Sequence, residues 1–194
     1  MTRTQLINKA IENKGYKTYL EIGVQKGINI RGVKCSNKTG VDPNPLSDDT
    51  THEMTSDDFF KTNKDTFDCV FVDGLHESEQ VYKDITNALE VLNEGGTILC
   101  HDMNPTSEEM QKVPRISNVW TGDCWKAWVK LRQEREDLNM FVVDTDYGVG
   151  VITRGKQKKL RNNIEITYKN FSKFKNNWLH LISTNDIKHY EPFK

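Results

Sequence analysis

The segment Phe67–Asp73, with the sequence FDCVFVD, restricts the possible folds more than any other part of the chain. Its near-continuous apolar run predicts a strand that is buried on both faces of a sheet. Residues 78–92 follow with apolar side chains at helical spacing, and Thr97–Cys100 is again strand-like. A strand, a helix and a second strand in this order form a βαβ unit with parallel strands.

The same alternation runs along most of the chain. Further strands are predicted at 18–22, 39–42, 140–143 and 148–152, and helices at about 6–11, 27–33 and 125–137. Gly15 is predicted to stop the first helix, and Gly95-Gly96 the helix that begins at Ser78. The pattern predicts an α/β fold with a mainly parallel, doubly wound sheet, in which ligands bind at the carboxyl ends of the strands.

Composition bears on where such a domain resides. The chain is 28% charged with a mean hydropathy of −0.70. Its longest apolar run is the four residues 69–72, far short of the ~20 that a membrane helix needs. The amino-terminal residues have no apolar segment typical of a secretory signal. We therefore expect a cytoplasmic protein without a membrane segment, and four free thiols at the cysteines, Cys35, Cys69, Cys100 and Cys124.

Charge is unevenly distributed along the chain. Residues 154–194 hold ten Lys or Arg against three acids, a charge of +7, which leaves −8 for the rest because the whole chain carries −1. We expect a domain over 1–153 and a basic extension over 154–194. Lysines alternate there with Phe171, Phe174 and Trp178, as on surfaces that bind single-stranded nucleic acid. The favoured interpretation is a helix that packs on the acidic core or on a second subunit, which would make the protein a homo-oligomer.

Two strand ends indicate a nucleotide-containing ligand. Glu21 ends the first strand and is followed by Gly23 and Gly27, which allow a tight turn and close approach of a ligand. Asp42 ends the second strand, where an acid can bind two ribose hydroxyls. Each feature alone fits an ordinary turn, but together they favour an adenosine-containing ligand. The middle glycine of G-x-G-x-x-G is missing, and Glu21 would repel a pyrophosphate, so the ligand is predicted to be cationic rather than NAD.

Two further strand ends carry groups suited to catalysis. Asp73 and His76 follow the central strand, and His101 and Asp102 follow the next one. Because neighbouring strands lie about 4.8 Å apart, these two acids and two imidazoles are predicted to converge at one edge of the sheet. Each has an ordinary explanation by itself, as a cap or a solvated side chain. Four together favour a functional site.

These residues resemble class I S-adenosylmethionine-dependent methyltransferases, in particular the small-molecule group related to cephalosporin hydroxylases and macrolide-sugar O-methyltransferases. The resemblance covers about residues 16–152. It is carried by YLEIGVQKG (19–27), GVDPNP (40–45), MTSDDFF (54–60), the long segment from VFVDGLH to CHDMNP (70–105) and VWTGDCWKA (119–127). It implies a Rossmann-like, seven-stranded sheet with helices on both faces.

The resemblance also implies roles in binding the cofactor, S-adenosyl-L-methionine. Its methionine part would lie against the loop of Gly23 and Gly27, with Glu21 just before it. Asp42 matches the acid that holds the ribose hydroxyls. Ser56 and Asp57 match the residues that contact adenine. Asp73 matches the acid that follows the fourth strand of the family. The short third strand of the family has no clear counterpart in this sequence.

At the reacting end, the resemblance implies that His76 is the general base, with Asp73 or Asp102 orienting it or holding a metal. A metal site would comprise Asp73, His101 and Asp102. Relatives have two adjacent acids where this chain has His101-Asp102. Mg²⁺ prefers oxygen ligands, whereas Mn²⁺ tolerates an imidazole better, so the sequence leaves the use of a divalent metal open.

The predicted activity is methyl transfer to a hydroxyl of a small molecule or of a sugar or glycan. Two alternatives stay open: an RNA-directed methyltransferase that uses the basic tail, and a non-catalytic protein that binds S-adenosylmethionine. Nucleic acid is the less favoured acceptor because the sequence lacks the Asn-Pro-Pro-aromatic motif of methyltransferases that act on base amines. Asn104-Pro105 is followed by Thr106. The segment 103–125 is predicted to be a lid over the acceptor. Its lining side chains would be Arg115, Trp120 and Trp125, with Trp128 in the core.

Overall fold

The computed structural model describes residues 1–161 and 163–194. Its strands are Thr18–Ile22 (β1), Asn37–Val41 (β2), Phe67–Val72 (β3), Leu92–Cys100 (β4), Leu138–Val143 (β5), Val149–Arg154 (β6) and Leu181–Ile182 (β7). They form one sheet in the order β2-β1-β3-β4-β6-β5-β7. Neighbouring strands are parallel except for β6, which runs antiparallel to β4 and β5. The predicted mainly parallel, seven-stranded α/β sheet is confirmed.

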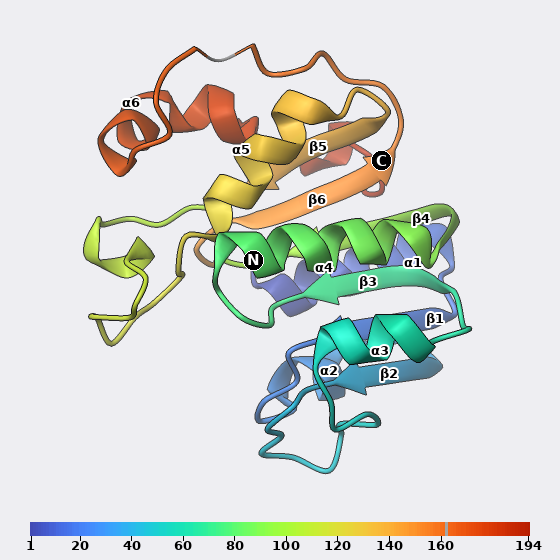
Figure 1. Cartoon of the computed structure of the whole chain (residues 1–194). Helices are drawn as coiled ribbons and strands as arrows, with labels where there is room; N and C mark the ends of the chain where they lie inside the picture. Colours follow the sequence, from blue (N-terminus) through green and yellow to red (C-terminus); the bar gives the residue numbers. More distant parts are fainter. Residues whose placement is uncertain (162) are drawn as a thin grey trace.

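Helices cover both faces of the sheet (Figure 1). They are Arg3–Lys14 (α1), Ile28–Gly32 (α2), Ser56–Thr62 (α3), Ser78–Glu90 (α4), Cys124–Glu134 (α5) and Tyr168–Leu179 (α6), with short 3-10 turns at Glu109–Gln111 (η1) and Ile187–His189 (η2). Successive strand residues point to opposite faces. Val70 therefore packs in the core beneath α3, α4, α5 and α6, and Phe71 in the core beneath α1.

Local sequence signals explain several boundaries. Thr2 and Gln5 form a capping box at the start of α1, and Gly15 ends that helix in the left-handed region at φ 68°, as predicted. Helix α4 begins at Ser78, whose backbone N–H donates to Asp123 Oδ1 at 2.7 Å. This bond fixes the segment before α5 against the start of α4, beside the carboxyl end of β3.

Two boundaries differ from the predictions. Helix α4 ends at Glu90, and β4 already begins at Leu92, so Gly95-Gly96 lies inside a strand. The pairing of β3 with β4 shifts register between Phe67 and Cys69, and Gly95 accommodates the irregularity at φ 75°. The region of the family's third strand holds only an isolated bridge between Val41 and His52, because residues 56–62 form α3 instead.

The C-terminal segment supplies the seventh strand. β7 pairs with β5 in parallel, at the edge opposite β2. On α6, the rings of Phe171 and Trp178 pack on Trp125, with centroids 4.4 and 6.1 Å apart. The helix therefore packs on the core of the same chain. The domain boundary near residue 154 stays a prediction.

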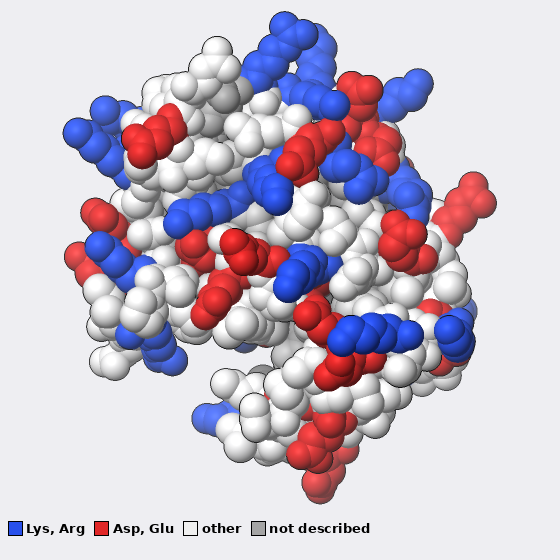
Figure 2. Space-filling model, viewed as in Figure 1, with Lys and Arg blue, Asp and Glu red and all other residues white. Residues whose placement is uncertain are grey.

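Basic side chains line the upper edge of the molecule in Figure 2, where Figure 1 has α6 and the segment before it. Exposed basic residues between 154 and 194 include Lys156, Lys158, Lys159, Lys169 and Lys173. All four cysteines are free, as predicted, and Cys69 and Cys100 are buried in β3 and β4. Among the described residues, no helix is both long enough and apolar enough to cross a bilayer.

Candidate active site

A cleft of about 1010 Å³ opens at the carboxyl ends of β1, β2, β3 and β4. Figure 2 shows the surface notched on the side to which these strand ends point in Figure 1. Nine of the ten predicted site residues line it: Glu21, Gly23, Asp42, Ser56, Asp57, Asp73, His76, His101 and Asp102. The structure therefore brings together groups that are far apart in the sequence.

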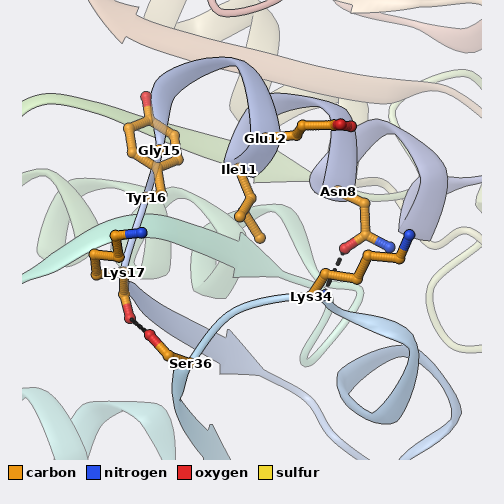
Figure 3. Close-up of a pocket in the computed structure, with 8 residues that line it drawn as sticks. All are labelled: Asn8, Ile11, Glu12, Gly15, Tyr16, Lys17, Lys34 and Ser36. Carbon is orange, nitrogen blue, oxygen red and sulfur yellow. Dashed lines mark hydrogen bonds between the residues drawn. The ribbon is translucent and has the colours of Figure 1, made fainter.

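A second hollow, of about 470 Å³, lies at the opposite edge of the sheet (Figure 3). It is formed by the end of α1, the residues just before β1 and the segment before β2. The side chain of Asn8 points to the backbone of Lys34, whose N–H donates to Asn8 Oδ1 at 2.7 Å, and none of the predicted site residues lines this hollow. The predicted catalytic groups, His76, Asp73 and Asp102, line the larger cleft instead.

The two glycines of the first loop have different surroundings. At Gly23, φ is 91°, and a Cβ atom would overlap the backbone carbonyl of Asp73, with its carbon 2.6 Å away. This position therefore requires glycine, because β1 and β3 end in contact here. Gly27 starts α2 at φ 69° and packs against the side chains of Ser47 and Asp49. Gly27 is the tenth predicted residue. It does not line the cleft itself, although its neighbours Lys26 and Ile28 do.

Glu21 is a buried carboxyl at the floor of the cleft. Its Oε2 accepts hydrogen bonds from Tyr19 Oη at 2.5 Å and from Asn29 Nδ2 at 2.8 Å. Burial raises the pKa of Glu21 to about 7, although these two bonds oppose the shift. A cation bound beside Glu21 would favour its charged form and reverse that shift.

The ends of β2 and α3 form the other half of the cleft. The carboxylate of Asp42 accepts backbone N–H bonds from Gln25 and Asn44, both at 2.8 Å, which fix its orientation. Gln80 on α4 donates from Nε2 to Ser56 Oγ at 3.2 Å and to Asp57 Oδ1 at 3.0 Å. These polar groups lie along one wall of the cleft, where a ribose and a base would need partners.

His76 lies between the two acids. Its Nε2 is 3.3 Å from Asp73 Oδ1 and its Nδ1 is 3.3 Å from Asp102 Oδ2. Burial lowers the pKa of His76, but Asp73 and Asp102 outweigh burial, so its pKa is raised above the ordinary value. Asp102 itself has φ 63°, a left-handed conformation that is costly for a residue with a side chain.

His101 has a different environment from His76. Its Nδ1 lies 3.4 Å from Asp73 and 3.2 Å from Asp102, and its Nε2 lies 3.4 Å from Asp146. Burial opposes protonation, but these acids raise the pKa of His101 well above its usual range. The guanidinium nitrogen Nη1 of Arg3 also lies 2.7 Å from Nε2 of His101.

The geometry bears on the predicted metal site. Among the described residues, the ligand atoms of Asp73, His76 and Asp102 all lie within 4.8 Å of one another. Two carboxylates and an imidazole suit Mn²⁺ better than Mg²⁺. His76, rather than His101, completes this group, and the cation of Arg3 beside His101 would repel a divalent ion bound there.

The segment 103–123 covers one end of the cleft. The ring of Trp120 stacks on His76 with centroids 5.2 Å apart, and the Trp120 carbonyl oxygen lies 3.2 Å from His76 Nδ1. Arg115 and Trp120 line the cleft, as predicted. The prediction for Trp125 is wrong, because this ring is fully buried between α5 and α6. Trp128 is in the core, as predicted.

Three contributors to the cleft have no motif in the sequence. They are Arg3 from α1, and Asp146 and Tyr147 from the β5–β6 turn. Gly122, in the loop before α5, does not line the cleft but packs against His76. At Gly122, φ is 57° and a Cβ atom would lie 2.5 Å from His76 Cβ. The positive φ at Gly122 is the feature that requires glycine beside His76, and φ cannot be read from the sequence.

The sheet order and the cleft define a Rossmann-like methyltransferase fold. Residues 20–103 match a family model described as a methyltransferase domain. A methyltransferase from Podospora anserina bound to S-adenosylhomocysteine has the same fold, with a TM-score of 0.61 and 17% identity over 79% of this chain and 78% of that one.

Two further solved structures share this fold at low identity. An O-methyltransferase from Streptomyces achromogenes, involved in tomaymycin synthesis and solved with S-adenosylmethionine, has a TM-score of 0.58 and 13% identity over 80% of each chain. An N-methyltransferase from Bradyrhizobium japonicum has a TM-score of 0.52 and 14% identity over 79% of this chain and 94% of that one. Among curated proteins, no sequence is significantly similar. Residues 20–103 are thus similar to a methyltransferase domain, and the chain has the Rossmann-like fold of these solved methyltransferases.

Proposed function

We propose that this chain methylates a hydroxyl group of a small-molecule or sugar acceptor, with His76 as the general base. The observation that carries the proposal is the position of His76, 3.3 Å from both Asp73 and Asp102, in the same cleft as the predicted cofactor residues. The O-methyltransferase of Streptomyces achromogenes, which shares the fold, supports the choice of oxygen as the acceptor atom. Fold alone does not fix the acceptor, since an N-methyltransferase shares it too.

The cleft fits S-adenosylmethionine by charge and by its polar groups. Six acidic and three basic residues line it, which favours a ligand with a positive sulfonium. We assign the ribose to Asp42, the adenine to Ser56 and Asp57, and the methionine part to Glu21 and the Gly23 loop. When bound, this group supplies an activated methyl, so the protein needs only to align the acceptor and remove its proton.

The surroundings of His76 suit proton removal by Nε2. A neutral His76 with its proton on Nδ1 donates to the Trp120 carbonyl oxygen, 3.2 Å away. Nε2 is then free to accept the proton of the acceptor hydroxyl. A bound S-adenosylmethionine would supply the methyl group to that oxygen and leave as the neutral thioether when the methyl–sulfur bond breaks. Asp73 stabilises the imidazolium that results. Such general-base catalysis contributes about 10²–10⁴-fold.

A divalent ion is a competing way to activate the hydroxyl. Asp73, His76 and Asp102 would hold it, and it would lower the pKa of a bound hydroxyl. A nitrogen of His76 that binds a metal is not available as a base. Activity that survives chelation and responds to His76 therefore favours the base, and activity restored only by Mn²⁺ or Mg²⁺ favours the metal.

Among acceptors, a small molecule is favoured over RNA. The acidic lining of the cleft repels a phosphate backbone, and the basic residues of α6 do not belong to that lining. Exposed apolar side chains line the mouth, namely Ile28, Leu75, Val119 and Tyr147. This lining suits a largely uncharged acceptor with an apolar face.

The test is a calorimetric titration of S-adenosylmethionine into chelator-treated protein, followed by methyl-transfer assays on a panel of hydroxylated acceptors. We expect micromolar binding, and His76→Ala should abolish transfer while changing cofactor affinity by a few-fold at most. His189→Ala, at an exposed position outside the cleft, is the matched control. Loss of cofactor binding in His76→Ala, with unchanged turnover per bound cofactor, would contradict the base assignment.

A further inference from the structure

Arg3 is the first residue of α1 and lies outside the region that matches the methyltransferase domain model. Its backbone N–H donates to Asp146 Oδ2 at 2.9 Å, and its Nη1 lies 2.7 Å from His101 Nε2. Nη1 also lies 3.7 Å from Asp146 Oδ1, and this ion pair holds the side chain at the carboxyl edge of the sheet, where it lines the cleft. The start of the chain thus places a fixed cation beside the catalytic groups.

Residues 1–161 and 163–194 give half of this guanidinium no partner. The contacts of the side chain with His101 and Asp146 are all made by Nη1. Among the described residues, neither Nε nor Nη2 has a hydrogen bond or ion pair, and the side chain is 34% exposed. A guanidinium presents paired N–H groups that match the two oxygens of a carboxylate.

The other two cations of the cleft are less suited to this role. Arg115 donates from Nε to the carbonyl oxygen of Ser117 and from Nη2 to that of Asn118. Its paired donors therefore already have acceptors within the protein. Lys26 is exposed on the glycine loop and has no partner that orients its side chain among the described residues. Of these three cations, Arg3 is therefore the one that is held in place and still has Nε and Nη2 available to bind a ligand.

Glu21 supplies the opposite charge. Both hydrogen bonds from Tyr19 and Asn29 reach its Oε2, which leaves Oε1 for a ligand. Glu21, at the end of β1, and Arg3, at the start of α1, line the same cleft. They nevertheless form no ion pair within 4.0 Å in the described part of the chain. Opposite charges in the lining of one cleft suit a zwitterion, which carries both an ammonium and a carboxylate group.

We propose that Arg3 and Glu21 together bind the α-amino acid end of the cofactor, with Arg3 on its carboxylate and Glu21 on its ammonium group. This inference rests on the proposed function, because it takes S-adenosylmethionine as the ligand. It assigns Arg3 to cofactor binding rather than to acceptor recognition or to support of His101.

Decarboxylated S-adenosylmethionine, which lacks only the carboxylate, separates these roles. We expect the wild-type protein to bind S-adenosylmethionine about ten- to a hundredfold more tightly than the decarboxylated compound, as a charge-assisted hydrogen-bonded pair allows. In Arg3→Gln, affinity for S-adenosylmethionine should fall to that of the decarboxylated compound, whose own affinity should stay within a few-fold. Arg3→Lys should recover part of the preference. Lys9→Gln removes a charge from the same helix, outside the cleft lining, and should change neither affinity.

Three results would overturn the inference. Arg3→Gln with the wild-type preference would show that the carboxylate lies elsewhere, and loss of the preference in Lys26→Gln instead would assign it to the glycine loop. Equal weakening of both compounds in Arg3→Gln would indicate that Arg3 only supports His101 and Asp146. In each case wild-type binding of S-adenosylmethionine keeps the proposed function, whereas wild-type protein that binds neither compound would refute the proposed function itself.

Discussion

Gly122→Ala tests whether the loop before α5 positions His76. The new Cβ would overlap the carbonyl oxygen of His76 and lie 2.5 Å from its Cβ, so either the loop or His76 has to move. Overpacking of this kind costs about 1–3 kcal/mol. Alanine at φ 57° adds about 1 kcal/mol of backbone strain. Together these give a loss of about 2–4 kcal/mol, which lowers the Tm by about 5–15 °C in a chain of this length.

Gly95→Ala is the matched control, because Gly95 has φ 75° and nothing within 4 Å of the position of a Cβ. It should carry the strain alone and lower the Tm by about 2–4 °C. Thermal unfolding and methyl transfer at saturating cofactor are measured for both variants. A shift of His76 by about 1 Å should reduce turnover by as much as 10²-fold in Gly122→Ala, and Gly95→Ala should keep normal turnover. Equal stability losses, with full activity in Gly122→Ala, would refute the reasoning.

Three further predictions concern the charges of the cleft and the C-terminal segment. Cofactor affinity should rise with pH through about 7, because Glu21 must lose its proton to attract a cation. In calorimetric titrations, Glu21→Gln should remove this pH dependence. A wild-type affinity that does not change with pH would contradict the prediction. In chelator-treated protein, turnover should rise with pH above 6.5, since the raised pKa of His76 keeps its imidazole protonated at lower pH. Asp102→Asn should shift this rise to lower pH. A rise at the wild-type pH in Asp102→Asn would count against the pairing of His76 with Asp102. Trp178→Ala should lower the free energy of unfolding in urea by about 3–5 kcal/mol, because the buried ring packs on Trp125; wild-type stability would show that the segment is not part of the core.

The alternation of strands and helices could be predicted along most of the chain because it depends on local periodicity. The run at 67–73 and the helix after it are examples, and both formed as expected. Errors occurred where local signals and pairing disagree. Gly95-Gly96 is a helix stop by composition, yet the pairing of Leu92 with Phe67 extends β4 through it. β7 was missed because two residues carry no periodicity of their own.

Much of the candidate site was also readable from the sequence. Residues such as Asp73 and Asp102 directly follow strands, and in a parallel sheet strand ends meet at one edge. The difference between His76 and His101 was not readable. It arises from Trp120 above the one ring and Arg3 beside the other.

The sequence by itself therefore determined the class of fold, the edge of the sheet that holds the candidate site and most of the residues that line it. Each of these depends on patterns within one strand and the turn that follows it. Only the tertiary structure decided which groups act together. Arg3 meets His101 across 98 positions of the chain, and the Trp120 carbonyl meets His76 across 44. Such contacts depend on how helices and loops pack over the sheet, and no local pattern encodes that packing.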